Sequence, residues 1–420
     1  MASKRSLALL LVLLGLALFC WEAQRWYEST LPQGAVFHSR AADNEIAGWH
    51  KGKKQWTVRA QRLTRTDDKI SFFNVDDGEL YRQGESPLLF STSMAEYYEK
   101  ENLLQFPAGI SFSADNRKLI VGKGFWDGKA NVFEGNDVTF TDPGITGSGA
   151  AEIAASTIRY NGTRKQWTFE NNVRISWRDA AKGETYLMQT PVLIVDDKLT
   201  RSSLPLPITI AGKAVSGSAA SGLDEHKSLI LDNISFRDEN MAAGLTADRA
   251  IKSDKGWLFT GKVAIRKDNG NYWRPGLVEI DNDDNIILAN ITGVLKDVIF
   301  SADRLFSADR KQYQAAGNIL IKPRPDIQLK ADSLTIAEEE EKYFFRKPRL
   351  QQDNGTAIAS DSGLYDGKRN LLIFEKNVVT RRKDGREIQA TKAVYNLENR
   401  VIEYTGEAQA TRNAAERGSE

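Results

Sequence analysis

The sequence predicts an all-β protein, elongated and built of repeats of about 30 residues, preceded by one N-terminal transmembrane helix. Three observations indicate this class. One phrase recurs at a steady step along the chain, which is typical of repeat architectures. Apolar residues alternate with a period of two, which is the strand period. One uncharged apolar run lies near the N-terminus.

The apolar run is Ser6–Trp21, and Lys4 and Arg5 precede it. This charge order keeps the N-terminus in the cytoplasm and exports the remaining chain. We expect a cytoplasmic stub and anchor over residues 1–25 and a linker over 26–44. A cleaved signal peptide is an alternative, although Trp21 stands two places before Ala23. Lipidation at Cys20 is another, although Phe19 replaces the small residue of a lipobox.

The repeated phrase is a small residue, an apolar residue, a turn, a strand, a Gly/Asn pair and an alternating apolar segment. Four clear copies begin at Ala302, Ala331, Ser360 and Ala390. Each begins about 30 residues after the one before, a step typical of repeat folds. Further copies begin at Ala155, Ser218 and Ala247, with weaker ones near Ala60, Ser93, Gly122, Met188 and Gly276. The length of the chain therefore reflects the number of repeats in one extended fold, and not a number of independent globular domains.

Each repeat is expected to hold two or three strands, because one strand of ordinary length is much shorter than the repeat. Alternation is clear at Val173, Ile175 and Trp177. No amphipathic helix is expected after the anchor. Turn signals separate the runs at Asp76-Asp77-Gly78, Asp127-Gly128, Asn161-Gly162, Lys255-Gly256, Asp366-Gly367 and Asp384-Gly385.

Two slots just before the Gly/Asn pair are apolar and mostly large in six copies. Stacked antiparallel strands would place these slots in a continuous row on one face. Two interpretations stay open: a filled core that joins two sheets, or an open apolar groove. The groove-lining candidates are Phe112, Phe140, Trp167, Phe169, Ile175, Trp257, Phe259, Ile265, Phe374 and Tyr404.

The composition argues against most enzyme classes. Three histidines lie far apart, a single cysteine excludes an internal disulfide, and no nucleotide-binding or hydrolase motif occurs. Lys plus Arg is 57 and Asp plus Glu is 56, so nothing favours nucleic acid. We expect no catalytic residues, no metal and no cofactor. Recurrent carboxylates follow the small residue in several copies, and strand-start hydrogen bonding explains them better than one active site: Asp248, Asp303, Asp332 and Asp361.

Two phrases carry a resemblance to a known family. The segments ADRLFSADRKQYQAAGNILI, from Ala302, and ATKAVYNLENRVIEYTGEAQA, from Ala390, resemble the OstA/LptA repeat of lipopolysaccharide transport. The earlier half resembles the LptC family, with a single anchor, then Trp56–Ala60, and later the stretch Tyr186–Leu231. The chain departs from that family because a typical LptC ectodomain is about half this size.

The resemblance implies an LptC-like β-jellyroll over residues 45–240, an LptA/OstA-like continuation over 241–412 and a flexible tail over 413–420. It also implies an inner-membrane, periplasm-facing carrier of lipopolysaccharide. The implied partners are the inner-membrane lipopolysaccharide ABC transporter and, at the C-terminal edge, an LptA-type bridge or an outer-membrane translocon protein. The departure in size puts in doubt whether a separate LptA is needed.

Two other functions are compatible with the sequence. The chain could be an anchored β-solenoid scaffold with a sealed interior and no lipid. It could also be a β-helix enzyme acting on polysaccharides, which would need charged residues gathered on one face. Lipid binding separates the first of these from the carrier, and a cluster of carboxylates or basic residues would indicate the second.

Overall fold

The computed structural model describes residues 34–40, 43–82, 86–114, 117–142, 151–178, 183–197, 201–213, 215–225, 228–239 and 242–412. These residues form antiparallel strands joined by turns, and no helix occurs among them. The all-β prediction is confirmed. None of the described segments is a helix long and apolar enough to cross a membrane. The expected anchor over residues 1–25 lies outside the described residues.

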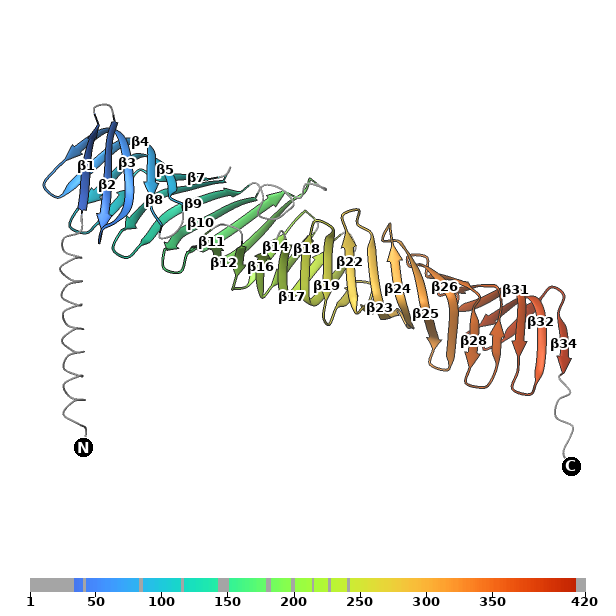
Figure 1. The fold of residues 1–420 in the computed structure, drawn as a ribbon. Coiled ribbons are helices and arrows are strands. Elements are labelled where there is room, and N and C mark those ends of the chain that lie inside the picture. Colours follow the sequence, from blue (N-terminus) through green and yellow to red (C-terminus); the bar gives the residue numbers. More distant parts are fainter. Residues whose placement is uncertain are drawn as a thin grey trace, which may run out of the picture. The chain divides into compact units, whose positions relative to one another are not determined.

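The described residues group into two compact units that divide at Leu206 and Pro207. The first unit holds strands β1–β13, apart from Thr185 and Tyr186 at the start of β12. Figure 1 shows its strands following one another in chain order. Their bounds are β1 Gly34–Arg40, β2 Asp43–His50, β3 Lys53–Arg65, β4 Lys69–Leu80, β5 Leu88–Tyr98, β6 Leu103–Phe106, β7 Ile110–Ala114, β8 Arg117–Asp127, β9 Val132–Asp142, β10 Ala151–Asn161, β11 Gln166–Arg178, β12 Thr185–Asp196 and β13 Arg201–Leu204.

The second unit holds the remaining strands and repeats the same hairpin plan. Their bounds are β14 Ile208–Ala211, β15 Val215–Ala219, β16 Ser221–Glu225, β17 Ser228–Asp238, β18 Ala243–Ser253, β19 Gly256–Thr260, β20 Ala264–Lys267, β21 Tyr272–Arg274, β22 Leu277–Asp281, β23 Ile286–Leu295, β24 Val298–Ser307, β25 Gln312–Arg324, β26 Ile327–Ala337, β27 Lys342–Arg346, β28 Arg349–Gln352, β29 Ala357–Ala359, β30 Ser362–Asp366, β31 Leu371–Arg381, β32 Arg386–Asn396, β33 Ile402–Thr405 and β34 Gln409–Arg412.

The predicted Gly/Asn pair is a corner inside a strand. In β25, Gly317 and Asn318 have φ of 71° and 42°, and in β11, Asn171 and Asn172 have φ of 62° and 58°. The register against the neighbouring strand shifts at these places, as at a β-bulge. Because Gly and Asn enter the left-handed region most readily, these residues let each long strand bend and continue as a second arm.

The two arms of each strand belong to two different walls of the unit. In β18, the residues Arg249–Ser253 pair with β19, whereas Ala243–Thr246 pair with β20. We call the wall that contains β19 wall A and the wall that contains β20 wall B. The equivalent division in the first unit puts β6 in wall A and β7 in wall B. The walls are joined covalently at the corners, and the hairpin turns at their opposite edges form what we call the mouth.

Each wall buries one face against the other wall. In β11 the buried residues alternate on both sides of the corner, with Trp167 and Phe169 in wall A and Val173, Ile175 and Trp177 in wall B. The strand period of two therefore explains the apolar alternation, and the exposed corner residues interrupt it between Phe169 and Val173. One predicted turn is wrong: Asp76-Asp77-Gly78 lies within β4, where it forms a corner and its register shift. The other five predicted turn signals lie at strand ends or in turns.

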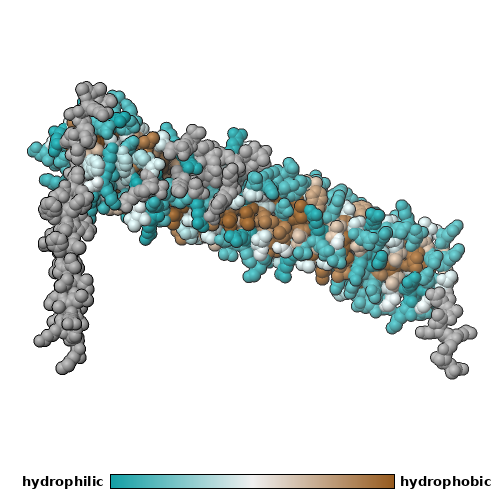
Figure 2. Space-filling view, viewed as in Figure 1, coloured by the Kyte–Doolittle hydropathy of each residue, from teal (hydrophilic) through white to brown (hydrophobic). Residues whose placement is uncertain are grey.

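Hydrophobic residues remain visible from outside as well. On the face that Figure 2 shows, they form a band along the first strands of the second unit and recur in smaller patches toward its C-terminal end, between hydrophilic margins. In that unit Trp257 is half-buried, and Ile299 and Phe344 are 54% and 45% exposed. The apolar surface of these strands is thus not wholly taken up by the packing of one wall on the other.

Candidate functional site

The apolar interior between the walls of the first unit brings together five of the predicted residues. Phe112, Phe140 and Ile175 belong to wall B, whereas Trp167 and Phe169 belong to wall A, and all five are buried. The ring centroids of Phe112 and Trp167 lie 6.2 Å apart, edge to face. Phe140 and Phe169 are also 6.2 Å apart. These contacts cross from one wall to the other, so the candidates form a packed interior.

Four of these rings also line a small crevice in the first unit. Its volume is about 40 Å³. Ordinary ligand pockets measure roughly 300–1,000 Å³, so the crevice holds no more than a water molecule or a methyl group. An acyl chain enters this space only if the walls move apart. The lining consists of Leu88, Phe112, Ser113, Arg117, Leu119, Phe140, Trp167, Phe169 and Asp197.

A polar rim accompanies the crevice. Asp197 forms an ion pair with Arg82, whose side chain is 11% exposed while that of Asp197 is 7% exposed. The pKa of the neighbouring Tyr160 phenol is raised, first by burial and then by the Asp197 carboxylate. Apolar rings and a nearly buried ion pair thus lie side by side, an arrangement that suits a molecule with a hydrocarbon part and a charged part.

The second unit places the other five candidates in the same relation to its walls. Phe259 and Phe374 in wall A and Ile265 in wall B are buried. Trp257 and Tyr404, both in wall A, are half-buried. The structure therefore brings eight of the ten predicted residues fully into the interiors, and the other two only in part.

Several interior aromatic residues were not among the predicted candidates. Phe236 from wall B contacts Trp257 and Phe259, with ring centroids 5.6 Å and 6.0 Å apart. Trp273 from wall B meets Tyr313 from wall A edge to face, at 4.9 Å. Tyr313 occupies one of the two apolar slots before its Gly/Asn pair, Gly317-Asn318. Phe236 comes after the corner of β17, where the alternation begins again in a new phase, and Trp273 lies in β21, a strand of only three residues.

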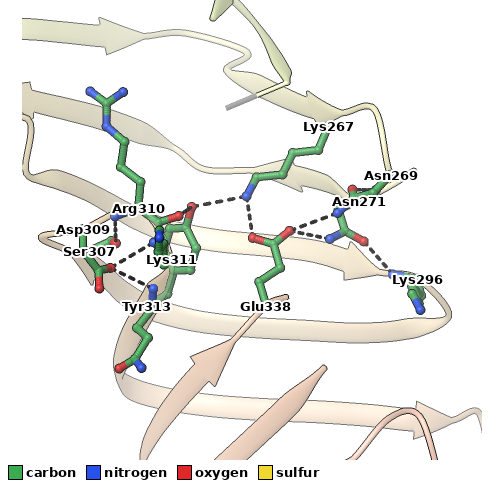
Figure 3. A network of polar contacts seen from close by, with 11 residues as sticks. Lys267, Asn269, Asn271, Lys296, Ser307, Asp309, Arg310, Lys311, Tyr313 and Glu338 are labelled. Carbon is green, nitrogen blue, oxygen red and sulfur yellow. Dashed lines mark hydrogen bonds and ion pairs between the residues drawn. The ribbon is translucent and has the colours of Figure 1, made fainter. Parts of the chain in front are cut away.

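Figure 3 shows a network of polar contacts around Lys267, Tyr313 and Glu338. The Lys267 ammonium lies 4.7 Å from the Trp273 ring centroid and donates to the Tyr313 hydroxyl at 3.3 Å. It also forms an ion pair with Glu338, which points toward it from the other side (Figure 3). Burial raises the pKa of Tyr313, and the Glu338 carboxylate adds to this shift.

The amide of Asn271 extends the same network. Its Nδ2 donates to Glu338 Oε1 at 2.5 Å, and its Oδ1 accepts from the backbone N–H of Lys296 at 2.9 Å. Asn271 is 5% exposed, so both ends of a nearly buried amide are satisfied. This residue carried no sequence signal, because its partners lie far along the chain.

Three of the recurrent aspartates, Asp248, Asp303 and Asp332, lie inside strands at corners, which corrects the predicted strand-start position, whereas Asp361 directly precedes β30. Asp303 accepts from Asn318 Nδ2 at 2.9 Å, and Asp361 accepts from Asn377 Nδ2 at 2.6 Å. Asp332 pairs with Lys347 at 3.5 Å. Asp303, Asp332 and Asp361 thus each make their polar contact at the corner of their own repeat. Within the described segments, no group of three or more His, Cys, Asp or Glu residues is placed to hold a metal ion.

Neither the comparison with protein-family models nor the comparison with curated proteins found a match to this chain.

Proposed function

We propose that this protein is a membrane-anchored periplasmic carrier that passes lipopolysaccharide from an inner-membrane ABC transporter toward the outer membrane. The acyl chains would travel between the two walls. The observation that carries the proposal is the paired apolar rows on facing walls, with Phe112 and Phe140 on one and Trp167 and Phe169 on the other. The sequence resemblance to LptC and to the OstA/LptA repeat supports it, as does the apolar run of an anchor.

The physical reason is the cost of exposing lipid to water. Transfer of each CH₂ of an acyl chain from an apolar environment into water costs about 0.8 kcal/mol of free energy. A bent antiparallel sheet offers apolar side chains on its inner face and satisfies its own backbone hydrogen bonds. We identify this two-walled arrangement with the twisted, open β-jellyroll that the resemblance implies.

The proposal extends to the ends of the chain. At the C-terminal end, β33 and β34 pair with β32. Backbone groups on a free strand edge accept another strand, which extends a sheet into a partner. The partner would be an LptA-type bridge or an outer-membrane translocon protein. Residues 1–25 would hold the other end in the inner membrane.

The test is in-cell photo-crosslinking from the interior. A photoactivatable amino acid at Phe140 or Trp167 should capture lipopolysaccharide. The matched control is Ile120, an apolar residue of β8 that is 43% exposed and should capture none. Equal capture at the two kinds of site, or capture at neither, would contradict the proposal.

A second candidate is a membrane-anchored scaffold that binds no lipid. It is favoured by the filled interior, because the predicted groove residues of the first unit are buried and leave about 40 Å³. The full chain, purified in detergent, separates the two functions. A carrier takes up a fluorescent lipopolysaccharide, and Trp167→Arg reduces uptake while Trp167→Phe does not. A scaffold shows no saturable uptake in any of the three forms.

A further inference from the structure

Charged residues at the mouth join the two walls of the second unit. Asp238, at the wall B end of β17, accepts from Arg310 at 3.1 Å, and Arg310 lies in the wall A turn between β24 and β25. The two residues are 72 positions apart. Their side chains are 19% and 24% exposed, so solvent screens this pair less than a surface pair.

The same relation recurs one hairpin later. Lys267 ends β20 in wall B, and Glu338 lies in the wall A turn between β26 and β27, 71 positions further on. Their side chains are 11% and 12% exposed. A third pair, Asp326 with Arg400, joins a wall B turn to a wall A turn at 3.2 Å and is 74 positions apart. A fourth, Lys296 with Glu341, joins turns of the two walls at 2.5 Å. In chain order the wall B partner is acidic in the first and last of the four pairs and basic in the two between them.

The first unit has an equivalent pair. Arg82 follows the wall B end of β4 and forms an ion pair with Asp197. Asp197 follows β12, at the end of that strand that lies away from its corner. In both units, ladder hydrogen bonds run within a wall, and the corners join the walls through the backbone. At the mouth, by contrast, side chains make the connections between the walls.

We propose that each unit opens along its mouth, and that these cross-wall ion pairs hold it closed. The interior then becomes accessible sideways, over the length of a wall, and the corners act as the fixed edge. The crevice of about 40 Å³ requires such a movement for any ligand larger than a methyl group. This inference concerns a movement of the protein alone, so it is independent of which ligand, if any, is carried.

The experiment measures access to a buried thiol in the full chain. Cys20, the single cysteine, is replaced by Ser, and Ala315→Cys provides a reporter on the inner face of wall A, where Ala315 is 3% exposed. The rate of maleimide labelling reports how often the walls separate. We expect Glu338→Gln to raise this rate at least about tenfold, because it leaves the Lys267 charge without its partner.

Two further variants make the result specific. The swap Lys267→Glu with Glu338→Lys restores opposite charges across the mouth, so its labelling rate should return toward that of the parent. Asp268→Asn removes a more exposed ion pair, with Arg237, between two wall B ends. It should leave the rate unchanged, since both partners belong to one wall.

The inference is overturned if Glu338→Gln labels no faster than the parent, or if Asp268→Asn speeds labelling equally. It is also overturned if the thermal midpoint of Glu338→Gln falls and the swap recovers that midpoint without slowing the labelling. The ion pair would then contribute to stability without controlling access to the interior. Failure to capture lipopolysaccharide by photo-crosslinking has no bearing on these rates, so the two proposals fail separately.

Discussion

Asn318 donates from Nδ2 to the carboxylate of Asp303 at 2.9 Å, across the corner where β25 bends beside β24. Asn377 and Asp361 repeat this contact at 2.6 Å in the hairpin of β31. In both places the amide side chain donates a hydrogen bond to the aspartate that follows the small residue of the repeat. The same Asn has the positive φ that the bend needs. Two features of the sequence phrase therefore meet in one structural element.

The corner glycine should be intolerant of any side chain. A Cβ at Gly317, which has φ of +71°, would lie 2.5 Å from Asp303 Oδ2. We expect Gly317→Ala to lower the free energy of unfolding by about 3 kcal/mol. Gly270 also has positive φ, at +89°, but a Cβ there meets nothing within 4 Å. Gly270→Ala should cost only about 1 kcal/mol. Urea denaturation of the two variants checks the difference, and equal losses would contradict it.

Trp273 should contribute to stability by its size and not by its indole N–H. The ring is 2% exposed and packs on Tyr313 and Phe300, while Nε1 makes no hydrogen bond. Trp273→Ala should therefore lower the free energy of unfolding by about 3–5 kcal/mol. Trp273→Phe should lower it by clearly less. Denaturation curves decide this, and a Phe variant as unstable as the Ala variant would show that the N–H matters.

Asn271 should contribute more to the free energy of unfolding than an ordinary exposed asparagine does. Its replacement by Ala leaves the backbone N–H of Lys296 without its acceptor and removes one donor to Glu338. We expect a loss of about 2 kcal/mol. Asn354 provides the comparison, since it is exposed and its Oδ1 accepts from the backbone N–H of Thr356. Asn354→Ala should cost less than about 1 kcal/mol in the same thermal or urea titration.

Stability should fall in alkaline solution because of buried tyrosines. Burial raises the pKa of Tyr97 to about 12, and its hydroxyl donates to Asn102 Oδ1 at 3.0 Å. The unfolded chain releases this proton near pH 10, so the neutral phenol stabilises the fold fully below pH 10. That contribution is lost as the pH rises from 10 to 12 and is on the order of 2 kcal/mol.

The measurement is a series of urea denaturation curves between pH 8 and pH 12. Tyr97→Phe should reduce the decline across this range, since phenylalanine has no proton to release. An identical decline in the variant would exclude Tyr97 as a contributor. Tyr343 and Tyr365 also have raised pKa values because of burial, so part of the decline should persist in the variant.

Local pattern was sufficient to predict the strands, their period and the step of the repeat. The slot occupied by Trp167 and Phe169 was predicted because alternation is continuous on one side of a corner. The place of Asp76-Asp77-Gly78 was predicted wrongly because a corner inside a strand and a hairpin turn use the same types of residue. Pairs such as Lys267 and Glu338 could not be predicted, because their separation depends on how the two walls cross.

Three of the cross-wall ion pairs of the second unit, namely Asp238 with Arg310, Lys267 with Glu338 and Asp326 with Arg400, constrain how the chain can change in length. Their partners are 71 to 74 positions apart, and the charges of the pair Asp238 with Arg310 are reversed in the pair Lys267 with Glu338. Removal of one repeat between Asp238 and Glu338 would bring these two acidic residues to nearly the same spacing. Two carboxylates would then face each other at the mouth. Loss of that single repeat is therefore incompatible with ion pairing at this part of the mouth.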